Sequence, residues 1–147
     1  MSFNVYIMTI LIPEQYNLIY RVSWISLAST LYALYRNHYT LWFVPGSIFL
    51  TSINYWRKPD YSWRRYLDIV VAKSMIAYQL TMAYKSEYAP IYYLITGTAL
   101  SCYPLGIYYY KKEEHWKSTY AHIMLHILCH VGNFILYSGS PLPLIGF

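Results

Sequence analysis

The chain has 147 residues, of which 57% are hydrophobic and only 12% are charged, and its formal net charge is +5. Soluble domains usually carry about 25% charged residues, so this composition excludes an ordinary soluble protein and indicates a single integral membrane domain. The positive charge does not indicate a nucleic-acid partner, because the basic residues lie in short loops rimmed by tryptophan and tyrosine, as membrane anchors do.

The chain opens with the apolar segment Phe3–Pro13. This segment lacks the basic start and the small-residue cleavage site of a secretory signal. It is also too short to cross the hydrocarbon core, which is about 30 Å thick. We expect it to lie in the membrane interface or to pack against the helices that follow.

Five apolar stretches, separated by short polar connectors, are long enough to be membrane-spanning helices. They cover residues Tyr16–Tyr35, Thr40–Trp56, Arg65–Tyr84, Pro90–Tyr110 and Ser118–Tyr137. Pro59 and Pro90 stand where helices are expected to start or stop, and Gly139 with Pro141 ends the last one. The sequence therefore predicts an all-α fold, a polytopic membrane helix bundle of about five transmembrane helices.

The distribution of basic residues predicts an orientation. With five spans, the N-terminus lies on the same side as the second-to-third and the fourth-to-fifth connectors. These two connectors carry most of the basic residues: Arg57, Lys58, Arg64, Arg65, Lys111, Lys112 and Lys117. The opposite side holds only Arg36 and Lys85. Because basic residues mark the cytosolic side, the N-terminus is predicted to be cytosolic and the C-terminus outside or lumenal.

Three histidines, His122, His126 and His130, recur at every fourth position of the last predicted helix. Imidazoles are costly in hydrocarbon, so ionisable residues at this depth indicate a functional site. Residues four apart lie one turn apart on one helix face, and a neighbouring pair could bind one metal ion. Alternatively, the imidazoles hydrogen-bond to neighbouring helices and only hold the bundle together.

The topology brings further polar residues to the level of these histidines. Ser52 lies late in the second predicted helix and Asp68 lies early in the third, so both share a membrane level with His122 and His126. A carboxylate that faces two imidazoles could complete a metal site, or it could hydrogen-bond to them and set their tautomers. His122 and His126 lie nearer this level than His130, which is the better candidate for a buried hydrogen-bonding residue.

This pattern resembles the superfamily often called CREST, which contains the alkaline ceramidases and the adiponectin/progestin receptor family. Its members share a serine followed four residues later by a histidine, an aspartate early in the next helix, and an HxxxH motif in the final helix. In this chain the segments 52–56, 65–69 and 122–126 are similar to these three motifs. Two departures stand out: Trp56 occupies the place of the first motif's histidine, and five helices are predicted where the superfamily has seven.

In that superfamily three histidines bind zinc, and the aspartate and serine lie near it. The resemblance therefore implies a zinc-dependent hydrolase of lipid amides or esters, with a lipid substrate drawn from the cytosolic leaflet. It implies His122 and His126 as zinc ligands and Asp68 and Ser52 as catalytic residues.

Two other functions stay open. The chain could be a non-enzymatic structural or assembly subunit of an organelle or virion membrane, with a degenerate site. It could also move protons or ions along the polar face of the last helix from His122 to Asn133. The small loops leave almost no soluble surface, so the expected partners are the lipid bilayer and other membrane subunits.

Overall fold

The structure, a computed structural model, describes residues 10–142, which form six α-helices and the turns between them. The helices are α1 (Pro13–Ser23), α2 (Ile25–Tyr35), α3 (Phe43–Trp56), α4 (Trp63–Ala83), α5 (Ala89–Lys111) and α6 (His115–Ser138). No strand occurs within residues 10–142, which confirms the predicted all-α class. Most of the Phe3–Pro13 segment, and with it the position expected for that segment, lies outside the described residues.

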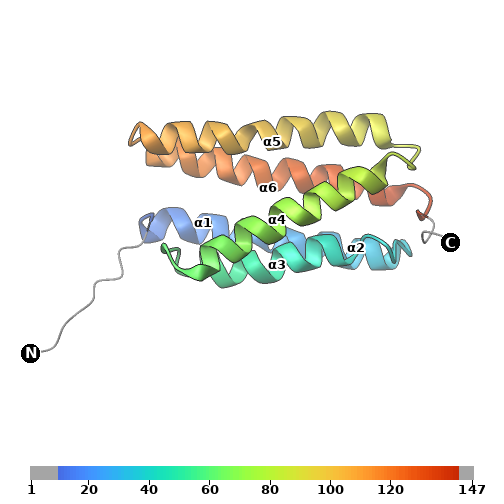
Figure 1. Ribbon diagram of the computed structural model, residues 1–147, viewed down its shortest axis with the longest axis horizontal. Coiled ribbons are helices and arrows are strands. Elements are labelled where there is room, and N and C mark those ends of the chain that lie inside the picture. The colour runs from blue at the N-terminus through green and yellow to red at the C-terminus, as the bar shows by residue number, and fades with distance from the viewer. Residues whose placement is uncertain (1–9, 143–147) are drawn as a thin grey trace, which may run out of the picture.

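The helices form an elongated bundle in which α5 and α6 run side by side as a hairpin (Figure 1). On the other side of the bundle, α1 and α2 lie end to end beside α3 (Figure 1). Helix α4 starts against α3 and crosses obliquely toward the beginning of α5 (Figure 1). This oblique path leaves α4 and α5 in contact over only a short length.

The first predicted helix, Tyr16–Tyr35, is divided at Trp24 into α1 and α2. The Trp24 amide donates to the Arg21 carbonyl at 3.2 Å, and the Leu27 amide donates to the Trp24 carbonyl at 3.1 Å. These bonds span three residues, as in a 3₁₀ turn, instead of the four of an α-helix. The Ser23 hydroxyl donates to the Ile19 carbonyl at 2.9 Å, a type of side-chain bond that often bends a helix. Apolarity alone did not reveal this interruption.

Two helices end in the same way, although neither ends at a glycine. Asn37 follows α2 and Glu113 follows α5, and both have φ of 61°. The amide of each residue donates to the carbonyl three residues earlier, and the next amide donates five residues back. This is the Schellman arrangement, which satisfies the last helical carbonyls. The turn after α2 also explains why α3 begins at Phe43 and not at Thr40 as predicted, since residues 38–42 form turns.

Helices α5 and α6 approach each other closely at glycine. A Cβ added at Gly132 would lie 3.0 Å from Thr96 Oγ1 and 3.5 Å from the ring of Tyr92. A larger residue at this position would push the two helices apart, and small residues at such contacts are typical of membrane helix pairs.

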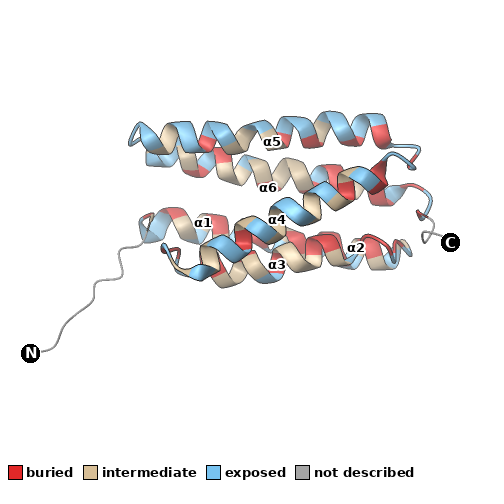
Figure 2. Ribbon diagram, viewed as in Figure 1, coloured by how far each residue is buried: buried red, intermediate tan, exposed pale blue. Residues whose placement is uncertain are grey.

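The outer faces of the helices are exposed (Figure 2). Many of the exposed residues are large and apolar. Leu94 of α5 is 71% exposed, Leu50 of α3 is 63% exposed and Val70 of α4 is 59% exposed. Among the described helices, only α6 is both long enough and apolar enough to cross a membrane. The interior, by contrast, holds many buried polar side chains.

Candidate functional site

The four site residues predicted from the sequence, Ser52, Asp68, His122 and His126, line a single cavity of about 240 Å³. The cavity lies inside the bundle and is walled by residues of α3, α4, α5 and α6. Most of the remaining wall is apolar and includes Ile48. The structure therefore brings together chemical groups that are far apart in the sequence.

Asp68 is held in place by two hydroxyl groups from the neighbouring helix. Thr51 Oγ1 and Ser52 Oγ each donate to Asp68 Oδ1 at 2.9 Å. The Asp68 side chain is buried, with 9% of its residue surface exposed, and neither hydroxyl uses its Oδ2. Thr51 was not predicted from the sequence, although its position beside Ser52 was the available signal.

The connector between α3 and α4 holds these two helices in register at this end of the bundle. The Arg64 guanidinium forms an ion pair with Asp60 at 2.8 Å and donates to the carbonyl of Asn54 at 3.0 Å. Hydrogen bonds from Ser62 and Arg64 hold the pKa of the Asp60 carboxyl below its ordinary value. The start of α4, whose second turn carries Asp68, is thereby placed against the last turns of α3.

His122 and His126 face each other one turn apart on α6. Their Nε2 atoms lie 3.2 Å apart, and their ring centroids lie 5.0 Å apart. Two nitrogen ligands at about 2.0–2.1 Å from a tetrahedral metal ion are separated by roughly 3.3 Å. The spacing of this pair therefore matches both a bond between two neutral imidazoles and two ligands of one metal ion.

No described residue joins this pair as a third protein ligand. Within residues 10–142 no group of three His, Cys, Asp or Glu side chains is arranged to hold a metal ion. The ring of Trp56 packs against the ring of His122 with centroids 4.7 Å apart, so tryptophan occupies the space next to the pair. The described residues thus supply two nitrogen ligands for a metal and fall short of the three that catalytic zinc sites use.

His130 lies in a different environment, although it also borders the cavity. Ser26 Oγ bonds to its Nε2 at 2.7 Å and Ser29 Oγ bonds to its Nδ1 at 2.9 Å. Both serines are on α2, so both ring nitrogens of His130 tie α6 to α2. His130 is the buried hydrogen-bonding residue that the sequence favours, and its serine partners were not predicted.

The polar network continues from His130 along α6. The side-chain amide of Gln79 on α4 donates to Asn133 Oδ1 at 2.5 Å and to the Tyr92 hydroxyl at 3.1 Å. The hydroxyl of Tyr137 donates to Gln79 Oε1 at 2.9 Å. Gln79 therefore joins α4, α5 and α6 inside the bundle.

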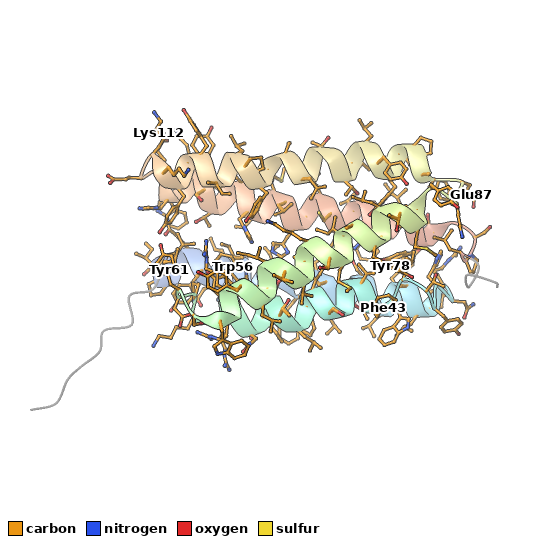
Figure 3. All side chains as sticks on the ribbon, viewed as in Figure 1. Phe43, Trp56, Tyr61, Tyr78, Glu87 and Lys112 are labelled. Carbon is orange, nitrogen blue, oxygen red and sulfur yellow. The ribbon has the colours of Figure 1, made fainter. Side chains whose placement is uncertain are left out.

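A second cavity, of about 410 Å³, adjoins the first. The two cavities share the lining residues Asp68, Ile69, Tyr103 and His122. Trp56 lines the second cavity, and it lies with Tyr61 at the end of the bundle where α3 ends and α4 begins (Figure 3).

Comparison of the chain with protein-family models, with curated proteins and with solved structures finds no match. The resemblance to the CREST superfamily therefore rests on the three short sequence motifs alone.

Proposed function

We propose that the chain is a multi-pass membrane protein that crosses the bilayer along the long axis of its bundle, with its N-terminus in the cytosol. The exposed apolar residues on the outer faces of α3, α4 and α5 support this proposal, because a soluble bundle would carry charge there. A glycosylation acceptor added after Phe147 should be modified in microsomes, and one added before Met1 should not. The reverse pattern would contradict the orientation.

For the intramembrane site, we propose zinc binding by His122 and His126 and hydrolysis of an amide or ester bond in a membrane lipid. The observation that carries this proposal is the shared cavity, which collects the two imidazoles, the Asp68 carboxylate and the Ser52 hydroxyl. A bound zinc ion would supply Lewis acidity toward a substrate carbonyl. Asp68, oriented by its two hydroxyl donors, is the proton acceptor that the chain itself offers in the cavity.

A second function is favoured by a different observation. Trp56 stands beside His122 where a third histidine would be needed, and the described residues complete no three-ligand metal group. On this view the chain is a non-enzymatic subunit of a membrane assembly, and the bond between His122 and His126 only stabilises α6.

The zinc content of detergent-purified protein separates the two functions. The hydrolase proposal predicts bound zinc that is lost in His126→Ala and kept in the control His115→Ala, which alters an exposed histidine at the start of α6. It also predicts that Trp56→His, which restores the third histidine of the motif, raises zinc affinity about tenfold or more. Hydrolysis of lipid amides or esters in proteoliposomes should be abolished by Asp68→Asn.

If neither the unaltered protein nor Trp56→His binds zinc, the metal site and the hydrolase are wrong, and the structural function stands.

A further inference from the structure

We propose that the second cavity binds the phosphate group of a membrane lipid whose acyl chain occupies the first cavity. The inference rests on the proposed membrane function, because it names the class of lipid that the same site receives. Its evidence is separate from the histidines and comes from the charge, the hydrogen-bond donors and the position of the second cavity.

The position of the second cavity suits a lipid headgroup. Its walls include Trp56 at the end of α3, Arg65 near the start of α4 and Lys111 at the end of α5. These helix ends meet at one end of the bundle, where Trp56, Tyr61 and Lys112 lie (Figure 3). The basic connectors place this end at the cytosolic headgroup level, where lipid phosphates lie.

The second cavity carries an excess of positive charge. Arg65 and Lys111 line it, and Asp68 is its one acidic lining residue. Within residues 10–142 the ion pairs are Arg64 with Asp60 and Lys117 with Glu114, so no described carboxylate pairs with Arg65. The guanidinium of Arg65 instead lies 5.5 Å from the ring centroid of Tyr61. A half-buried guanidinium that no described carboxylate neutralises is well suited to bind a phosphate.

One lining residue of the second cavity, Trp56, holds an unused hydrogen-bond donor. Trp56 is 8% exposed, and its buried indole Nε1 has no hydrogen-bond partner among residues 10–142. Buried donors are nearly always paired, so an orphaned one calls for an explanation such as a ligand. A phosphate oxygen in the second cavity would accept this bond.

The two cavities together match one lipid molecule. They meet at Asp68, Ile69, Tyr103 and His122, and the first cavity continues between α4 and α5 past apolar residues such as Ile76 and Leu100. At the seam between these helices, Lys73 Nζ lies 6.0 Å from the ring centroid of Tyr103. A phosphate in the second cavity would therefore direct the attached acyl chain past the Ser52–Asp68 pair.

Lipid binding by the detergent-purified full chain tests the proposal. Four probes are compared by their effect on the melting temperature: phosphatidic acid, a diacylglycerol with the same chains, phosphatidylcholine and inorganic phosphate. Phosphatidic acid should stabilise the protein at the lowest concentration, and inorganic phosphate should need at least a hundredfold more. The diacylglycerol, which lacks the phosphate, should have little effect.

Matched variants locate the binding. Arg65→Gln should raise the concentration of phosphatidic acid that gives half of the maximal stabilisation tenfold or more. Arg57→Gln, at an exposed position of the same connector, should leave this concentration unchanged. Trp56→Phe keeps an aromatic ring beside His122 but removes the indole N–H, and should weaken the response several-fold.

Three results would overturn the proposal. An equal loss of stabilisation by phosphatidic acid in Arg65→Gln and Arg57→Gln would show that the lipid is attracted to the basic end of the bundle in general. Equal response to diacylglycerol would show that only the chains bind, and equal response to inorganic phosphate would exclude the lipid as the source of the phosphate. Zinc content is measured in the same samples, so a retained metal with no lipid selectivity would reject this inference and leave the proposed zinc site standing.

Discussion

Histidines recur at every fourth position of α6 from His122 to His130, yet the two halves of this helix differ in the hydrogen bonds of their side chains. In the half that begins at His130, polar side chains bond to other helices: His130 to α2, and Asn133 and Tyr137 to Gln79 of α4. In the half that holds His122 and His126, the two imidazoles bond to each other. Both halves border the same cavity.

Hydrogen bonds to other helices, more than residue type, thus separate the structural part of α6 from its candidate site. We call the half that begins at His130 the saturated half of α6 and the half that holds His122 and His126 the open half. A buried polar group with all its partners stabilises one packing of the helices, whereas a group with free valences can still bind a ligand. The two halves should therefore respond differently to substitution.

The largest effect is expected at His130. His130→Ala removes two bonds to α2 and leaves the hydroxyls of Ser26 and Ser29 without their partner. The free energy of unfolding should fall by about 2 kcal/mol. The matched change His126→Ala, one turn earlier, should cost less than about 1 kcal/mol because the side chain of His126 bonds only to His122 among the described residues. Chemical denaturation in micelles measures both.

If the two alanine variants lost equal stability, or if His126→Ala lost more, the division of α6 into a saturated half and an open half would be wrong. In that event the pair His122 and His126 would be part of the structural core.

The next effect in size is expected at Gln79 of α4, which bonds to Asn133 and Tyr137 in the saturated half of α6. Gln79→Leu leaves Asn133 Oδ1 and the hydroxyls of Tyr92 and Tyr137 without this partner. We expect a loss of about 1–2 kcal/mol. Tyr92→Phe removes only one of these bonds and should cost about 0.6 kcal/mol, a typical value for a hydrogen bond between membrane helices. Equal losses in the two variants would show that Gln79 does not connect the network.

A smaller effect is expected at Asp68 of α4, which lines the first cavity together with the open half of α6. Ser52→Ala and Thr51→Ala each remove one of the two hydroxyl donors to Oδ1. Each should cost about 0.5–1 kcal/mol, and the double variant should cost more than the sum because the buried carboxyl then keeps neither donor. A double-mutant cycle on thermal unfolding measures the coupling. Strict additivity would show that the two hydroxyls do not orient Asp68 together.

The sequence predicted the positions of the later helices well, because apolar length and polar connectors determine them. The predicted stretches Arg65–Tyr84 and Ser118–Tyr137 correspond to α4 (Trp63–Ala83) and α6 (His115–Ser138). The interruption at Trp24 could not be predicted in this way, because it depends on local hydrogen bonds of Arg21 and Ser23 and not on hydrophobicity.

For the site, the order of helices was enough to bring Asp68 to the level of His122, since adjacent helices run antiparallel. The rotation of each helix about its axis was not predictable, because α2 is apolar on most of its surface. The bonds of Ser26 and Ser29 to His130 depend on that rotation. The same is true of Trp56, whose contact with His122 follows from how the last turn of α3 faces α6.

The smallest effect is expected from the pH dependence of His38, which lies between α2 and α3 and packs against Tyr137 in the saturated half of α6. Its Nε2 lies 3.3 Å from the Gly139 carbonyl, and its buried Nδ1 has no hydrogen-bond partner among residues 10–142. Burial lowers the pKa of His38 below its ordinary value of 6.5, and the charge of Arg36 adds to this. The unfolded chain therefore binds the proton more readily than the folded one, so stability is unaffected above pH 6.5 and decreases as the pH falls below it. The melting temperature in detergent should drop between pH 7.5 and 5.5, and His38→Asn should drop less. An identical drop of the melting temperature in both proteins would assign the pH dependence to other groups, and protonation of His38 would then not destabilise the fold.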